Sequence, residues 1–236
     1  MITLLDETGS TNADIAAAIR RGEGWAEGHW LVARRQTAGR GRQGRQWFDG
    51  AGNFMGSSVV TLRPGDPPPA SLSFVAALAV HDAAAALVGE GATLALKWPN
   101  DVLLDGGKLS GILLEMVQGR IIIGIGVNLA HAPQVPERRT AALADVTATP
   151  APEEFAARLA ACFAERLAAW RTFGLAPILS AFLLRSIHAP GTPVTVHDSD
   201  GARITGTFAG LDEADGALRL RLADGRERAI RAGDIS

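Results

Sequence analysis

The chain contains 236 residues, of which 47% are hydrophobic and 20% are charged, and its formal net charge is -2. This composition is typical of a folded soluble protein with a sizeable core, and it provides no general positive field for nucleic acids or anionic membranes. The single cysteine, Cys162, excludes an intrachain disulfide framework; with no leader or membrane span expected, it favours a cytoplasmic protein.

The hydrophobic pattern predicts helices and strands over the first part of the chain. In chain order we expect a helix at 13–23 capped by Ser10, Thr11 and Asn12, strands at 29–36 and 53–62, an alanine-rich helix at 70–89, a strand at 93–98, a meander at 102–129, and helices at 152–173 and 175–186. The turns of the meander, at 105–107 and 118–120, are short enough to make it antiparallel.

After about His188 the pattern changes to short alternating strands separated by Gly and Asp turns. These runs lie at 191–198, 202–211, 216–225 and 226–235. Short, evenly spaced strands are typical of a small five-stranded barrel-like module. We therefore predict a large domain at 1–187 and a small β domain at 188–236.

The segment QTAGRGRQGRQW, residues 36–47, interleaves arginines with glycines. The glycines are Gly39, Gly41 and Gly44, and the arginines are Arg40, Arg42 and Arg45. Glycines let the backbone approach an anion closely, and arginines offer forked donors to phosphate or carboxylate. No Walker-type GK[ST] follows, so a solvated basic loop is the plain alternative. Trp47 favours a functional role because an aromatic ring can stack on a base or close a loop.

The rare cationic and amide residues cluster in a few segments. The chain has only two lysines, Lys97 and Lys108, and four asparagines, Asn12, Asn53, Asn100 and Asn128. Where arginine is the usual cation, a retained lysine indicates a need for a compact ammonium group. Strict strand alternation predicts that Lys108 and Ser110 share one face of their strand. Each segment alone also fits an ordinary turn or bulge, but their joint clustering favours a site.

Four motifs, QTAGRGRQGRQW, KWPNDVLL, KLSGILLE and IGIGVNL, occur in this order and resemble those of the biotin protein ligases. The resemblance covers nearly the whole chain and departs mildly at Gln43 and at Phe54-Met55. Since little chain precedes Ser10, it is the monofunctional class, without an N-terminal DNA-binding domain, that the chain resembles. The resemblance implies an α+β fold: a mixed, largely antiparallel sheet flanked by helices, followed by a small C-terminal SH3-like β-barrel.

The family resemblance also implies a two-step reaction with ATP, Mg²⁺ and biotin. The biotin carboxylate attacks the α-phosphate of ATP, which gives biotinyl-5′-AMP and pyrophosphate. A lysine amine of a biotin carboxyl carrier protein then attacks the mixed anhydride and releases AMP. The expected partner is that carrier protein of a biotin-dependent carboxylase, with no DNA, no membrane and a possible homodimer.

The site residues are assigned by the same resemblance, and the metal ligands stay open. Catalysis is expected from Lys108 and Arg42. Biotin binding is expected from Ser10, Thr11, Asn12, Gln36, Gly39, Arg40, Gly41, Arg42, Lys108, Gly111 and Gly124. ATP binding is expected from Arg42, Arg45, Trp47, Lys97, Asn100, Asp101 and Asn128. Gly111 and Gly124 are expected to let the biotin ring system lie against the sheet, and residues 37–47 are expected to be mobile without ligand.

Two other classes of function remain open on the residues alone. A lipoate-type acyl ligase would share the catalytic architecture. A nucleic-acid-binding module would use the Gly/Arg loop with Trp47 as a stacking platform, although the net charge of -2 disfavours it. A purely structural scaffold would leave the clustered lysines and asparagines unexplained.

Overall fold

The computed structural model describes residues 1–48, 50–136, 138–198 and 202–235. Its larger unit is built on a seven-stranded sheet in the order β1-β2-β3-β7-β6-β5-β4. The strands are β1 (Ile2–Leu5), β2 (Trp30–Ala33), β3 (Phe54–Thr61), β4 (Leu94–Lys97), β5 (Asp101–Leu104), β6 (Gly107–Val117) and β7 (Arg120–Val127). β1 and β2 pair in parallel and the other neighbouring strands pair antiparallel, so the prediction of a mixed, largely antiparallel sheet is confirmed.

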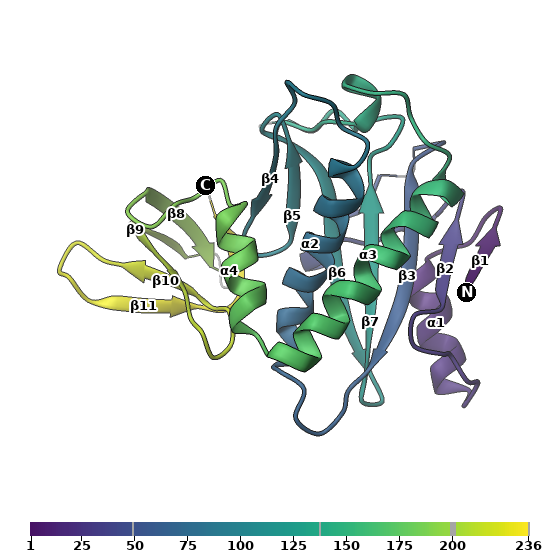
Figure 1. Ribbon diagram of the computed structural model, residues 1–236, viewed down its shortest axis with the longest axis horizontal. Helices are drawn as coiled ribbons and strands as arrows, with labels where there is room; N and C mark the ends of the chain where they lie inside the picture. The colour runs from purple at the N-terminus through teal and green to yellow at the C-terminus, as the bar shows by residue number, and fades with distance from the viewer. Residues whose placement is uncertain (49, 137, 199–201, 236) are drawn as a thin grey trace.

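Helices cover both faces of this sheet (Figure 1). They are α1 (Thr11–Arg20), α2 (Leu72–Ala85), α3 (Pro152–Phe173) and α4 (Ala176–Leu184). Helices α2 and α3 lie together on one face, and α1 contacts β3 and β7 on the other. Small alanines on α2 let the helix approach the sheet closely, because an alanine side chain adds little bulk at the contact.

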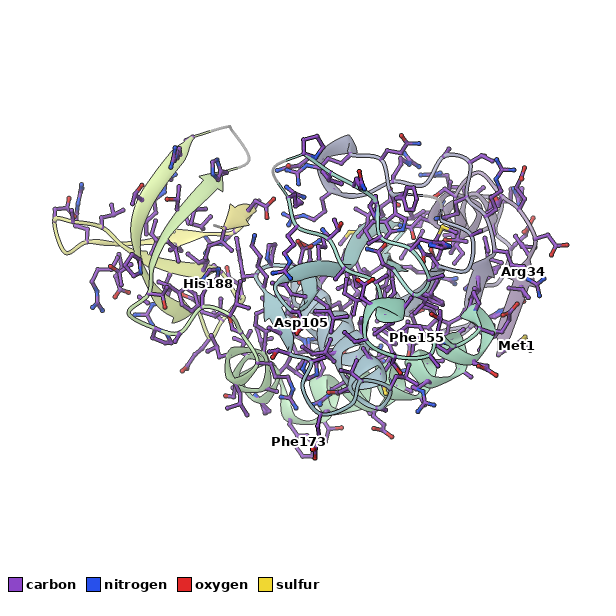
Figure 2. All side chains as sticks on the ribbon, turned by 90° about the horizontal axis from the view of Figure 1, so that it is seen from above. Met1, Arg34, Asp105, Phe155, Phe173 and His188 are labelled. Carbon is purple, nitrogen blue, oxygen red and sulfur yellow. The ribbon has the colours of Figure 1, made fainter. Side chains whose placement is uncertain are left out.

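Aromatic side chains fill the space between the sheet and α3. The Trp30 and Phe163 rings meet edge to face at 5.6 Å, and Phe54 meets Phe155 at 5.5 Å. All four rings are almost fully buried, and each such burial contributes on the order of 2 kcal/mol. At the outer end of α3, Phe173 projects away from the molecule (Figure 2).

The smaller unit is a five-stranded antiparallel sheet in the order β11-β10-β9-β8-β12. Its strands are β8 (Pro193–Asp198), β9 (Arg203–Leu211), β10 (Leu218–Arg221), β11 (Glu227–Ile230) and β12 (Gly233–Ile235). The chain enters it near His188 (Figure 2). The unit is tied to the large one by Trp98 Nε1, which donates to the carbonyl of Gly216 at 3.2 Å.

Three local features differ from the sequence predictions. β1 was not predicted, because four residues with only partial burial give a weak pattern. Helix α1 begins at Thr11, and Ser10 occupies the N-cap without a capping side-chain hydrogen bond. The last predicted run divides into β11 and β12 because Arg231 and Ala232 form no ladder pairs. Within the described ranges, no helix combines the length and hydropathy needed to cross a bilayer.

Candidate functional site

A cavity of about 790 Å³ opens beside α1, on the face of the large sheet opposite α2 and α3. Its walls come from the N-terminus of α1, the segment 36–48, strands β3, β6 and β7, and strand β12 of the small unit. Every residue assigned above to catalysis, biotin or ATP lines this cavity except Gly39 and Lys97. Segments more than a hundred residues apart in sequence therefore converge on one site.

The two exceptions lie just outside the cavity wall. A Cβ added at Gly39 would lie 3.2 Å from Gln36 Nε2 and 3.4 Å from the Trp47 carbonyl oxygen, so this glycine permits close packing of the loop. Lys97 lines a second cavity of about 550 Å³, which also contacts Lys108 and Asp101. The second cavity adjoins the first through these shared residues, so Lys97 lies next to the first cavity.

Lys108 forms a salt bridge of 2.6 Å between its Nζ and Asp101 Oδ1. Both side chains are largely buried, at 20% and 11% exposure. A carboxylate and an ammonium this close attract each other strongly where water is scarce. The ion pair fixes the position of the ammonium group at one end of the cavity.

A β-bulge turns Lys108 toward the cavity. Leu103 pairs with Lys108 and Val102 pairs with Ser110, so β6 carries Leu109 as an extra residue. Leu109 and Ser110 are both fully buried, and Ser110 Oγ donates to a carbonyl of β7. The prediction that Lys108 and Ser110 share a face is wrong, because a bulge interrupts the two-residue alternation. Lys108 instead lies beside Gly111 on the cavity side.

Arg42 links the Gly/Arg loop to both units. Its Nη1 donates to Asn100 Oδ1 at 2.9 Å and to the Gly233 carbonyl at 3.4 Å. Burial lowers the pKa of the guanidinium, and the charges of Asp234 and Asp101 oppose this effect. The group stays cationic because a guanidinium titrates far above neutral pH.

Asp234 of β12 was not expected at the site, and nothing in its sequence context marks it. It pairs with Arg45 at 3.3 Å and with Arg138 at 3.4 Å. Burial raises the pKa of its carboxyl, but Lys97, Arg45 and Arg138 outweigh burial and hold the pKa below its ordinary value. The small unit therefore supplies an anion that pairs with Arg45 of the Gly/Arg loop and with Arg138.

The opposite end of the cavity is neutral and polar. The backbone nitrogen of Thr11 donates to Gln36 Oε1 at 2.7 Å, and the hydroxyls of Thr11 and Ser57 meet at 2.6 Å. Ser57 Oγ donates to Asn12 Oδ1 at 2.6 Å. The sequence pattern did not indicate Ser57, because a serine inside an apolar strand is an ordinary occurrence. Ser57 pairs with Gly124 of β7, and this pairing, which could have pointed to the site, is known only once the strands are aligned.

Side chains of the protein lie over the sheet glycines, which differs from the expected stacking of a ligand ring there. Asn12 occupies the space above Gly124, and the Trp47 indole lies on Gly126 and Gly111. A Cβ at Gly124 or Gly126 would overlap these side chains, so the glycines make room for Asn12 and Trp47. Trp47 Nε1 is buried and finds no hydrogen-bond partner among the described residues.

We expect Gly126→Ala to displace Trp47 from the sheet, because the new methyl group overlaps the indole ring. The emission of Trp47, isolated by subtracting the spectrum of the matching Trp47→Phe variants, should shift to the red. The overpacking should cost about 1–3 kcal/mol of unfolding free energy if the ring cannot leave. Gly9→Ala is the matched control, since nothing lies within 4 Å of its added Cβ. Unchanged emission with an unchanged melting temperature would contradict the packing.

Oxygen ligands for a hard cation are few. No group of three or more His, Cys, Asp or Glu side chains is placed to hold a metal within the described part of the chain. Two residues that line the cavity carry candidate oxygens, the Asp101 carboxylate and Asn128 Oδ1, and the latter is buried with no partner in the parts of the chain that the structure describes. This donor set fits Mg²⁺ held mainly by the phosphates of a ligand, with one or two protein oxygens completing its shell.

The chain is similar to known proteins over most of its length. Residues 8–129 match the model of the biotin/lipoate A/B protein ligase family, and residues 191–236 match the biotin protein ligase C-terminal domain. The chain is 43% identical to a biotin–[acetyl-CoA-carboxylase] ligase of Paracoccus denitrificans, over 95% of both chains. It is 37% identical to the ligase of the same name from Mycobacterium tuberculosis, over 99% of this chain and 88% of that one.

A solved structure has the same overall fold. The biotin protein ligase from Aquifex aeolicus, in complex with biotin and ATP, superposes with a TM-score of 0.84 at 26% identity. The match covers 100% of this chain and 97% of the other. The large sheet and the small C-terminal sheet therefore occur together, in the same arrangement, in both proteins.

Proposed function

The chain belongs to the biotin/lipoate A/B protein ligase family, and from that premise we propose that it attaches biotin to a lysine of a carrier protein at the expense of ATP. The observation that carries the proposal is the division of one cavity into two ends. The Lys108 end is cationic, and the Thr11 end is neutral and rich in hydrogen-bonding groups. Biotin needs both, because it carries a carboxylate at the end of its chain and an uncharged ureido ring at the other end.

At the neutral end, Ser10, Thr11, Asn12 and Gln36 bind the ureido ring. Their hydroxyl and amide groups match a neutral ligand that both donates and accepts hydrogen bonds. The Ser10 hydroxyl fits this role, because it makes no capping hydrogen bond to helix α1. Gly39, Arg40 and Gly41 shape the loop over the ring, Gly111 forms the floor once Trp47 moves off it, and Gly124 makes room for Asn12.

At the cationic end, Lys108 and Arg42 bring the biotin carboxylate and the α-phosphate together. The carboxylate oxygen bonds to the α-phosphorus, and the bond to the pyrophosphate oxygen breaks. Fixed cations lower the barrier by neutralising charge that develops on the phosphate oxygens. The carrier lysine then attacks the acyl carbon, and AMP leaves.

The remaining nucleotide contacts are assigned to Arg45, Trp47, Lys97, Asn100, Asp101 and Asn128. Lys97 lies in the adjoining second cavity, which suits the β- and γ-phosphates. Bound Mg²⁺ would supply charge neutralisation of the triphosphate, with Asp101 and Asn128 as candidate ligands. Trp47 leaves Gly126 when the loop rearranges, and the mobility of residues 37–47 stays a prediction.

The surroundings of the site support further proposals. The carrier domain of an acetyl-CoA carboxylase is the proposed acceptor, following the names of the relatives. The division into domains 1–187 and 188–236 is supported by the gap between α4 and β8. A cytoplasmic location, a homodimer and the lack of DNA binding stay predictions.

Two alternatives are less well supported. The relatives at 43% and 37% identity carry the name of biotin ligases, which disfavours lipoate as the substrate. Arg42 and Arg45 point to Asn100 and Asp234, so these two arginines do not form an outward basic strip for nucleic acid.

One reaction tests the function directly. The protein is mixed with biotin, Mg-ATP and a biotin carboxyl carrier domain, and the carrier is weighed by mass spectrometry. We expect the mass of one added biotin, no change without ATP, and no change when the carrier lysine is replaced by arginine. Transfer of lipoate in preference to biotin would overturn the choice of substrate, and no transfer of either would overturn the proposed activity.

A further inference from the structure

Glu115 is an acid on β6 that stands between apolar neighbours, in the run Ile-Leu-Leu-Glu-Met. It lies two positions beyond Leu113, which lines the cavity, and it pairs across the sheet with the fully buried Ile122. Within the described residues, no Lys, Arg or His nitrogen forms a salt bridge with it. Its hydrogen-bond donor is Asn12 Nδ2, which lies 2.6 Å from Oε2.

This bond begins a chain of four side chains, Glu115, Asn12, Ser57 and Thr11, which we call the polar chain. Ser57 Oγ lies 2.6 Å from Asn12 Oδ1, and Thr11 Oγ1 lies 2.6 Å from Ser57 Oγ. Asn12, Ser57 and Thr11 are nearly fully buried. Water therefore does not compete for these hydrogen bonds, and each proton must have one acceptor within the polar chain.

An ionised carboxylate sets the direction of every link, because it can only accept. Glu115 therefore faces Asn12 Nδ2, and this orientation turns Asn12 Oδ1 toward Ser57. Ser57 then donates its single proton to Asn12, so Thr11 must donate to Ser57.

The end of the polar chain determines what Thr11 offers to a ligand. Its proton is directed to Ser57, the shorter contact, with Gln36 Oε1 at 3.1 Å as a weaker second acceptor. Gln36 Oε1 is already occupied by the Thr11 backbone nitrogen at 2.7 Å. Both lone pairs of the Thr11 hydroxyl remain to accept from a ligand N–H in the cavity.

We propose that Glu115 is a positioning residue for biotin recognition: through Asn12 and Ser57 it fixes the Thr11 hydroxyl as an acceptor for a ureido N–H. This inference rests on the proposed function, since it concerns the polar end of the same cavity. Without the carboxylate, the Asn12 amide can turn over. Its Nδ2 would then donate to Ser57 and Ser57 would donate to Thr11, so the polar chain would reverse. The Thr11 hydroxyl would keep one free lone pair instead of two, and its freed proton could point toward a ligand N–H and oppose it.

The test compares two variants, Glu115→Met and Glu23→Met. Glu23 is an exposed acid just after α1, the helix that carries Thr11 and Asn12. Dissociation constants are measured for biotin, for desthiobiotin, and for the two biotin isomers methylated at one or other ureido nitrogen. For E115M we expect biotin and desthiobiotin to bind about tenfold more weakly, the effect of losing one hydrogen bond tied to a charged group. One methylated isomer lacks the N–H that donates to Thr11, and its dissociation constant should change less than about twofold between the wild type and E115M. The KM for ATP in pyrophosphate exchange should also change less than about twofold. E23M should match the wild type throughout.

A second pair of variants, which moves the carboxylate from position 115 to position 12, distinguishes the proposed role from a folding defect in E115M. Asn12→Asp alone places two carboxylates in contact and should weaken biotin binding more than E115M does. Adding Glu115→Gln to Asn12→Asp restores a donor–acceptor pair, and a carboxylate oxygen at position 12 still accepts from Ser57. Biotin affinity should therefore return to within about threefold of the wild type.

The outcomes distinguish a failure of the proposed role of Glu115 from a failure of the proposed biotin ligase function. A wild-type protein that binds no biotin overturns the proposed function. If the wild type binds biotin, three results each overturn the role of Glu115 alone: E115M binding within about twofold of the wild type, an equal loss for both methylated isomers, or no rescue in the double variant.

Discussion

Lys108→Met should abolish formation of the adenylate, with at least about a hundredfold loss in the rate of biotin-dependent ATP–pyrophosphate exchange. The reason is the loss of a fixed ammonium from the point where two anionic reactants must meet. Methionine keeps much of the length and apolar stem of the side chain, so packing changes little. Exchange of labelled pyrophosphate into ATP measures the step without any carrier protein.

The variant also leaves Asp101 as a buried carboxylate without its 2.6 Å partner. We therefore expect a lower melting temperature, because a buried carboxylate without a partner destabilises the folded state. The double variant Lys108→Met, Asp101→Asn removes that charge and should recover stability without recovering exchange. Recovery of both would show that Lys108 acts only by neutralising Asp101.

Lys97→Met is the matched control, because it removes the other lysine of the chain from the adjoining cavity. It should raise the KM for ATP several-fold and leave the KM for biotin near the wild-type value. Equal losses of exchange in the two methionine variants would contradict the separate positions of the two amines.

Arg42→Ala should release the reactive intermediate faster, with leakage of biotinyl-5′-AMP increased on the order of tenfold or more. Arg42 holds the Gly/Arg loop to Asn100 and to Gly233 at once. Losing two hydrogen bonds from a charged group corresponds to roughly 3 kcal/mol, although part of this is lost in rearrangement of the loop. The rate of release is measured by trapping the adenylate without a carrier protein.

Arg42→Lys keeps the charge, but its shorter side chain does not bring the ammonium to the position of Nη1, the atom that donates to both acceptors. We expect it to recover adenylate formation in part while still leaking the intermediate. If Arg42→Ala retained its intermediate as the wild type does, the loop would not close through this residue, and the cation alone would be its contribution.

The sequence predicted most of the fold because its signals were local. Alanine-rich α2, the glycine turns of β5-β6-β7 and the short strands after His188 each carry a pattern that neighbours in sequence suffice to define. The short, partly exposed β1 carried no such pattern. It forms only because β2 provides a parallel edge for it.

The site was predictable where its residues are unusual for this chain and hidden where they are ordinary. Lys108, Asn100 and Asn128 stood out against a background of arginine and alanine. Asp234 and Glu115 did not, because acids are common in the sequence and their importance depends on contacts across more than a hundred residues. Contacts of that range arise from packing, which no local pattern reports.

The β-bulge at Leu109 determines which face of the sheet carries the Lys108 amine. Deleting Leu109 would leave Leu103 paired with Lys108 and Val102 with Ser110 in a regular ladder, so the lysine would keep its face of the sheet. Keeping Leu109 in a ladder without the bulge would instead put the lysine on the same face as Ser110, and its amine would face the helices across the sheet. An inserted residue that no bulge accommodates would therefore matter more in this hairpin than most substitutions.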